Sequence, residues 1–177
     1  MQNGSMRRML VLTAEWLNLK IMKTYINAII LGLFGAAAVT VAFMLQWPTW
    51  TMFLAWVSYY LFGKSIKTSI PVFVQIIFGI MMGVGIMVSA RFFETIIGTA
   101  GFQLAVFLFI GSLAFLSKIE GLKSIPAWFI GLIIIFGVHP ELEFVAIVSL
   151  LIPVIAGFTF AWLNDSSLKI VSKSFNN

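Results

Sequence analysis

The sequence predicts an all-α polytopic membrane protein with six transmembrane helices. Of its 177 residues, 61% are hydrophobic and 10% are charged, and the mean hydropathy is +1.07. Soluble chains are about half apolar and about one quarter charged, so this composition excludes a soluble domain and also a disordered chain. The apolar residues fall into six blocks that short polar segments separate, and basic residues flank these blocks. Together these observations predict one compact membrane domain.

Four of the blocks are long enough to cross a bilayer as helices. They comprise residues 25–45, 70–90, 96–116 and 142–163. Each approaches the roughly 20 residues that a helix needs to cross about 30 Å of hydrocarbon. We therefore expect the first, third, fourth and sixth transmembrane helices at these positions.

Two further blocks, residues 50–62 and 125–138, fall short of this length but are too apolar for loops in water. One interpretation is a pair of short helices that cross with help from their neighbours or from local thinning of the bilayer. The alternative is a pair of re-entrant segments that the surrounding protein shields from lipid. Six crossings in total keep the basic residues together on one side.

The basic residues predict the orientation. With the N-terminus in the cytoplasm, only Arg91 lies outside, which is a strong positive-inside bias. We expect residues 1–24 to form a cytoplasmic segment, either an interfacial helix or disordered, residues 25–163 to form the membrane domain, and residues 164–177 to form a frayed cytoplasmic tail. The residues expected inside are Arg7, Arg8, Lys20, Lys23, Lys64, Lys67, Lys118, Lys123, Lys169 and Lys173.

The two short blocks occupy matching places, second among the first three spans and second among the last three. Each ends in a Phe-Gly pair, and an alignment of Phe62-Gly63 with Phe136-Gly137 also aligns Gly83 with Gly157. Because each half has an odd number of spans, the sequence permits a 3+3 inverted repeat. Paired short helices in inverted repeats mark solute paths in transporters. The alternative is two ordinary short crossings.

The run "WPTWTMFLAWVSYYLFGKSIKTSIPVFVQIIFGIMMGVGIMV" resembles the YcdZ-like family of small bacterial inner-membrane proteins of unknown function. The shared pattern joins Phe53 with Tyr59 and Tyr60, and a glycine-rich helix follows. The resemblance covers residues 22–163 and implies an inner-membrane protein with transport-like architecture, but no established substrate. Here the second short block continues into the acidic segment "GVHPELE", which departs from the glycine-rich turn of that family.

The spans are expected to hold uncharged polar groups and aromatic rings, with Arg91 and Glu94 at a boundary. Proton-coupled transporters carry titratable groups inside the membrane, so this pattern argues against ion-coupled transport. Motifs for nucleotide binding or nucleophilic catalysis are missing, so we expect neither an enzyme nor a cofactor. For Gln75 a hydrogen bond to a neighbouring helix is the alternative to a role in the pore. The candidate residues of a solute path are Phe53, Ser58, Tyr59, Tyr60, Phe62, Gly63, Gln75, Gln103, Phe136 and Gly137.

The only histidine, His139, lies with Glu141 and Glu143 in the last expected outer loop, where Pro140 breaks the helix. These three residues either belong to a solvated loop or line an outer vestibule. One histidine and two carboxylates make a weak case for a metal site, and we expect none.

Small residues predict close helix packing, either within one chain or between copies of it. The residues concerned are Gly32, Ala36, Gly79, Gly83 and Gly157. Six short helices barely enclose a pore, so a homo-oligomer is expected. The expected partners are the lipid bilayer, other copies of the chain and a small solute, and no nucleic acid.

These features favour a passive channel or facilitator for a small, mostly uncharged solute across the bacterial inner membrane, with both termini cytoplasmic. A small ion channel is a variant, in which Glu141 and Glu143 concentrate cations. The competing hypothesis is a structural or accessory membrane protein without a pore, whose polar residues face other helices.

Overall fold

A computed structural model describes residues 2–175, although the side chains of residues 2–12 and 14, including Arg7 and Arg8, are outside the described part. All regular structure in residues 2–175 is helical, which confirms the all-α prediction. The helices are α1 (Gln2–Met44), α2 (Thr49–Leu61), α3 (Ile66–Ile97), α4 (Ala100–Leu116), α5 (Ile125–Val138), α6 (Phe144–Ser149) and α7 (Leu151–Ser174).

Three helical stretches are long and apolar enough to cross a membrane: Glu15–Met44, Ile66–Ile97 and Phe144–Ser174. The last combines α6 and α7, which only Leu150 separates, and that residue keeps a right-handed helical backbone. The shorter helices α2, α4 and α5 lie between the long ones in the chain. The predicted short second and fifth helices are therefore present, with α5 at the predicted bounds.

The predicted end of the third span is wrong, and the boundary expected after residue 24 lies inside a helix. Helix α1 is continuous from Gln2, so the expected segment 1–24 and the first span form one helix. Helix α3 continues through the expected outer loop to Ile97, because residues 91–97 contain neither glycine nor proline. The turn falls at Gly98, whose positive φ of 65° ends the helix in a conformation that glycine adopts without strain.

The predicted frayed tail is also wrong for the described residues, because α7 continues to Ser174. Residues 164–174 contain no helix breaker, and Lys173 in the last turn interacts favourably with the helix dipole. This extension brings Asn164 and Asp165 into a packed helix, where both are buried.

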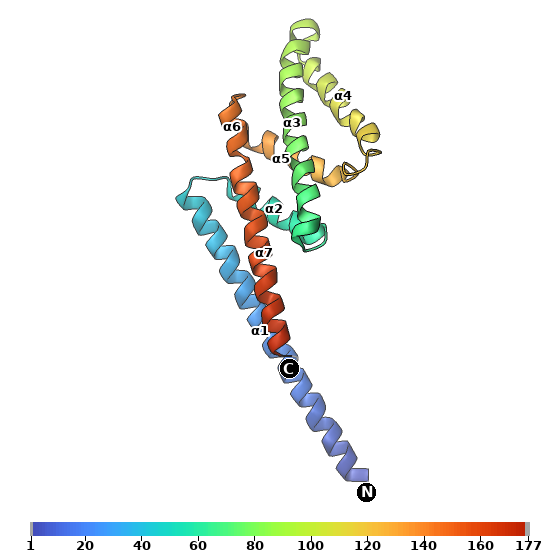
Figure 1. Cartoon of the computed structure of the whole chain (residues 1–177), viewed down its shortest axis with the longest axis vertical. Coiled ribbons are helices and arrows are strands. Elements are labelled where there is room, and N and C mark those ends of the chain that lie inside the picture. Colours follow the sequence, from blue (N-terminus) through green and yellow to red (C-terminus); the bar gives the residue numbers. More distant parts are fainter. Residues whose placement is uncertain (1, 176–177) are drawn as a thin grey trace.

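The helices pack as two similar halves. Helix α3 makes its main contacts with α4 and α5, and α7 makes its main contacts with α1 and α2. Figure 1 shows α4 beside α3 while α5 crosses it, and α1 beside α7 while α2 crosses it. When α1, α2 and α3 are matched with α4, α5 and the combined α6 and α7, the contacts of one half correspond to the contacts of the other. This correspondence is the packing expected for a 3+3 repeat.

The hydrophobic core follows the same division. One cluster joins α3, α4 and α5 and contains Ile86, Ala105 and Trp128. A second joins α1, α2 and α7 and contains Ala42, Trp56 and Ala161. A third cluster lies between them and draws residues from α2, α3, α5 and α7, which holds the two halves together.

Glycines set the closest helix contacts in each half. A Cβ on Gly79 would collide with the backbone of Trp128 and Gly131, and a Cβ on Gly157 would collide with the backbone of Met52 and with the Cβ of Ala55. By this geometry Gly157 corresponds to Gly79. The sequence alignment that pairs Gly157 with Gly83 is therefore out of register. It matches the two Phe-Gly pairs, although these pairs do not occupy equivalent positions relative to the turns that follow the two short helices.

The turns agree with the corrected register of the two short helices. The register that matches Met52 with Trp128 also matches Gly63 (φ 119°), just after α2, with His139 (φ 49°), just after α5. Gly83 instead lies against the side chain of Ile135. A Cβ added to Gly32 would have no neighbouring atom within 4 Å, and Ala36 is exposed, so neither packs closely against another helix of the chain.

The turns of the chain lie on two opposite flanks in the view of Figure 1. The α2–α3 turn, the α4–α5 turn and the end of α7 lie on one flank, which we call the basic flank. Its lysines are Lys64, Lys67, Lys118, Lys123, Lys169 and Lys173. The α1–α2, α3–α4 and α5–α6 turns lie on the opposite flank, with Arg91, Glu94, His139, Glu141 and Glu143 in or near them.

Candidate functional site

Buried polar side chains are concentrated where α2 packs against α7. The buried polar or charged residues in the described part are Thr51, Ser58, Gln75, Asn164 and Asp165. All but Gln75 belong to α2 or α7. Burial of a polar group costs free energy unless a hydrogen bond compensates for it. This contact is therefore the first candidate for a functional site.

Hydrogen bonds connect the end of α2 to α7 near the basic flank. The Tyr59 hydroxyl donates to Oδ2 of Asp165 at 3.0 Å, and the Tyr60 hydroxyl donates to Oδ1 of Asn164 at 2.6 Å. Oδ2 of Asp165 also pairs with Nζ of Lys169 at 2.6 Å. We call these five residues the tyrosine–carboxylate cluster.

The charges of this cluster compensate each other. The Asp165 side chain is only 8% exposed, whereas that of Lys169, one turn later on α7, is 61% exposed. A buried carboxylate is tolerated when it is paired and hydrogen-bonded, and here Lys169 and Tyr59 supply both partners. Nζ of Lys64 lies 5.0 Å from the centre of the Tyr60 ring, where the ring's negative face attracts it.

A line of small and polar side chains runs along α2 toward this cluster. Thr51, Ala55 and Ser58 are spaced by four and three residues, so they share one face of the helix, and each is fully buried. Ala55 lies against Gly157 of α7. We call Thr51, Ala55 and Ser58 the α2 stripe.

Two hydrogen-bonding atoms near the ends of the stripe have no partner. They are the Thr51 hydroxyl oxygen and the side-chain nitrogen of Asn164. Ser58, in contrast, donates to the Leu54 carbonyl at 2.7 Å. An unpaired buried polar group costs about 1–3 kcal/mol, so these two atoms are places where a bound polar molecule would be stabilised.

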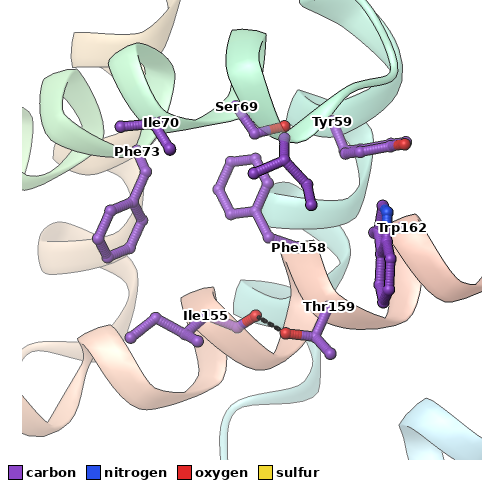
Figure 2. A pocket seen from close by; sticks show the side chains of 9 residues that line it. Tyr59, Ser69, Ile70, Phe73, Ile155, Phe158, Thr159 and Trp162 are labelled. Carbon is purple, nitrogen blue, oxygen red and sulfur yellow. Dashed lines mark hydrogen bonds between the residues drawn. The ribbon is translucent and has the colours of Figure 1, made fainter.

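Two hollows lie near the two ends of α2. The first, of about 470 Å³, is lined by the α1–α2 turn, Trp50 and the end of α5 at Gly137 and Val138. The second, of about 270 Å³, is an apolar groove between α3 and α7 with Tyr59 at its edge, and Figure 2 shows it from close by. The α2 stripe runs from the neighbourhood of the first hollow to the cluster.

The two glutamines predicted for a solute path have different environments. Gln75 is buried on α3, where its Nε2 donates to the Pro71 carbonyl at 3.1 Å and its Oε1 accepts from the Ser124 amide at 2.7 Å. The second bond satisfies an amide just before the first turn of α5. Gln103 is exposed on α4. The structure therefore does not bring the two glutamines together.

The predicted aromatic residues are also dispersed. Phe53 is exposed on α2, 6.4 Å from the ring of Trp56, whereas Phe62 packs against the central core. Phe136 contacts both the central core and the core of α3, α4 and α5. They do not form one constriction in this conformation.

The remaining predicted residues occupy the ends of the short helices. Gly63 ends α2, and Gly137 in the last turn of α5 leaves room for the Trp50 ring. His139 follows α5, and Glu141 and Glu143 are exposed in the turn before α6. Within residues 2–175, no three histidine, aspartate or glutamate side chains gather as metal ligands would.

Sequence reasoning missed Asn164 and Asp165, because a charged residue just after an apolar block is the usual sign of a span's end. One signal could have found them. Asp165 and Lys169 are four residues apart, the spacing of an ion pair on one helix face, and no glycine or proline intervenes. Asp165 lies just beyond the last predicted span, residues 142–163, and is nevertheless buried.

A family model described as "Protein of unknown function (DUF1097)" matches residues 28–167. The match covers α2 to α6, the C-terminal part of α1 and most of α7, and it includes four of the five cluster residues. Neither the curated proteins nor the solved structures contain a match to the chain.

Proposed function

Because the chain belongs to the DUF1097 family of proteins of unknown function, we propose its function from its geometry. The chain is a passive channel or facilitator for a small, mostly uncharged solute across the bacterial inner membrane. The observation that carries this proposal is the α2 stripe, a buried line of small and polar side chains with unpaired hydrogen-bonding atoms near both ends.

The path follows the contact between α2 and α7. It begins at the hollow beside Trp50, passes Thr51, Ala55 and Ser58, and ends at the tyrosine–carboxylate cluster. Because Lys169 compensates Asp165, the cluster carries no net charge, which favours a neutral solute over an ion. The close contact of Ala55 with Gly157 and the bond of Tyr60 to Asn164 close the path in this conformation, so α2 must move relative to α7 for a solute to pass.

The membrane topology belongs to the same proposal. Six crossings with the basic flank in the cytoplasm satisfy the positive-inside rule, and they make the two halves inverted, as in transporters built from repeats. The resemblance to the YcdZ-like family supports an inner-membrane location. Both termini are then cytoplasmic.

A homo-oligomer is also part of the proposal. Gly32 and Ala36 lie on a face of α1 that contacts no other helix of the chain, and Gly111 of α4 likewise has no neighbour within 4 Å of a Cβ position. Small residues on exposed faces of membrane helices allow close approach of a second copy.

A second candidate is an accessory membrane protein without a pore. The internal hydrogen bonds of Gln75 and Ser58 favour it, because both side chains are satisfied within the chain. This candidate gives the unpaired atoms of Thr51 and Asn164 no role.

Flux measurements separate the two candidates. Purified protein in liposomes is tested by stopped-flow light scattering under gradients of urea, glycerol and salt. We expect urea or glycerol flux above that of empty liposomes, little salt flux, and a decrease of at least severalfold in the variant Asn164→Leu. The matched control is Gln103→Leu, which removes an exposed amide and leaves flux unchanged.

Flux equal to that of empty liposomes for every solute would favour the accessory protein. Salt flux above urea and glycerol flux would favour the ion channel. Circular dichroism and size-exclusion chromatography verify that Asn164→Leu is folded before its flux is compared.

A further inference from the structure

The groove between α3 and α7 has a polar end and an apolar end. Figure 2 shows Tyr59 and Trp162 at one end, Phe158 in the middle, and Ile70, Phe73 and Ile155 at the other end. Ile70 is 59% exposed and Trp162 is 41% exposed, so the groove is open along its length. Because Tyr59 lies in the last turns of α2, its end of the groove is the one nearer the basic flank.

The polar groups of the groove are already satisfied. The Thr159 hydroxyl donates to the Ile155 carbonyl at 2.9 Å, a bond visible in Figure 2, and the Ser69 hydroxyl donates to the Ser65 carbonyl at 2.8 Å. The Tyr59 hydroxyl donates to Asp165. The groove therefore offers hydrocarbon and aromatic surface to an occupant, and an alkyl chain fits this chemistry better than a polar solute.

The polar end of the groove lies beside two exposed lysines. Lys67 follows Ile66, which lines the groove, and Lys64 lies in the preceding turn. No described acidic side chain pairs with either lysine. Basic sites between membrane helices on the cytoplasmic side bind anionic lipid headgroups, and Trp162 belongs to the aromatic residues that favour the headgroup level.

We infer that this groove binds an anionic phospholipid of the cytoplasmic leaflet. One acyl chain lies along Phe158 toward Phe73 and Ile155, and the phosphate headgroup lies at the polar end, near Lys64 and Lys67. Lys64 and Lys67 attract the negative charge of a phosphate headgroup. A second copy of the chain would instead bring further lysines to this region, and like charges repel, so the lipid is the favoured occupant. The inference does not depend on solute transport.

Fluorescence quenching by brominated lipids tests this site. The full chain and its Trp162→Phe variant are reconstituted in vesicles whose acyl chains carry bromine, with either phosphatidylglycerol or phosphatidylcholine as the lipid. The difference between the two proteins isolates the quenching of Trp162. We expect phosphatidylglycerol to bind beside Trp162 more tightly than phosphatidylcholine, by about fivefold (about 1 kcal/mol) for each participating lysine.

Three variants locate the headgroup and the acyl chain. The double variant Lys64→Asn with Lys67→Gln should abolish the preference for phosphatidylglycerol, whereas Lys118→Gln, on the same flank but in the α4–α5 turn, should retain it. Thr159→Phe fills the groove and should lower the quenching of Trp162 by both lipids. This last variant distinguishes a chain inside the groove from lipid that merely surrounds the protein.

Equal quenching of Trp162 by both lipids would overturn the inference, because it would indicate unselective surrounding lipid. No quenching by either lipid would also overturn it, since a second copy would then cover the groove, and the oligomeric mass would reveal that copy. A preference that persists in the double variant would contradict the assigned headgroup position.

Discussion

At the scale of single residues, the contact of Tyr59 with Asp165 connects two helices that are far apart in the sequence. Tyr59 is 2% exposed and donates to a carboxylate that Lys169 also contacts. Removal of one partner from such a contact leaves the other buried without compensation, which costs more than the net value of the bond. The cluster is therefore a structural connection as well as a candidate site.

This contact predicts the effects of substitutions on α7. Asp165→Ala should lower the free energy of unfolding by about 1–3 kcal/mol, because it leaves the buried Tyr59 hydroxyl unpaired. Lys173→Ala removes an exposed charge from the same helix and should cost less than about 1 kcal/mol. Chemical unfolding in detergent, followed by circular dichroism, measures both values.

A double-mutant cycle gives the control for this prediction. Tyr59→Phe combined with Asp165→Ala should cost less than the sum of the two single changes, because the second change removes a bond that is already lost. Strict additivity would show that the contact contributes nothing to stability.

The residues of this cluster are only partly predictable from the sequence. Tyr59 and Tyr60 stand out because hydroxyl groups in an apolar block must find partners, but the sequence does not identify those partners. Asn164 and Asp165 follow the last apolar block, and only the packing of α7 against α2 makes them buried. Burial of a polar residue at a span's end depends on tertiary contacts, which a single sequence does not specify.

At the scale of the helices, glycine determines how closely the elements approach. Gly79 and Gly157 each lie against the backbone of a short helix, so even a methyl group at these positions would collide with main-chain atoms. Main-chain atoms of a packed helix cannot move aside as the end of a flexible side chain can. The short helices α5 and α2 are thus held in equivalent ways by α3 and α7.

These glycine contacts predict different effects for chemically identical substitutions. Gly79→Ala and Gly157→Ala should each destabilise the protein by roughly 1–3 kcal/mol through overpacking. Gly32→Ala lies on an open face of α1 and should be neutral or stabilising by up to about 1 kcal/mol, because alanine favours the helix. Thermal unfolding in detergent compares the three variants. Equal effects at all three positions would contradict the packing described for α3 with α5 and for α7 with α2.

The helices themselves are predictable to different extents. The bounds of α5 agree with its apolar block because the backbones of Ser124 and His139, the residues on either side, are not in the right-handed helical conformation. The predicted end of α3 is misplaced, since charged residues near Arg91 suggest a loop although nothing in that segment breaks a helix. Hydropathy therefore locates apolar blocks, whereas the ends of α3 and α5 depend on the local backbone at Gly98 and His139.

At the scale of the whole molecule, the two halves have similar packing although their sequences are dissimilar. The cluster at α2 and α7 has no equivalent at α5 and α3, where Gln75 instead caps the start of α5. A repeated scaffold with one polar half is consistent with a path on that half alone. The proposed topology of six crossings makes the second half inverted in the membrane, so it requires that α2 and α5 each cross it.

Labelling of single cysteines tests this requirement most directly, because the natural chain contains no cysteine. Cysteines replace Lys67, Lys123 and Lys173 on the basic flank and Gln46, Thr99 and Glu141 on the opposite flank, one in each variant. A membrane-impermeant maleimide is applied to intact cells and to inverted vesicles. The proposed topology predicts labelling of the first three only in inverted vesicles and of the last three only in intact cells. Labelling of positions 46 and 67, or of 123 and 141, from the same side would contradict it.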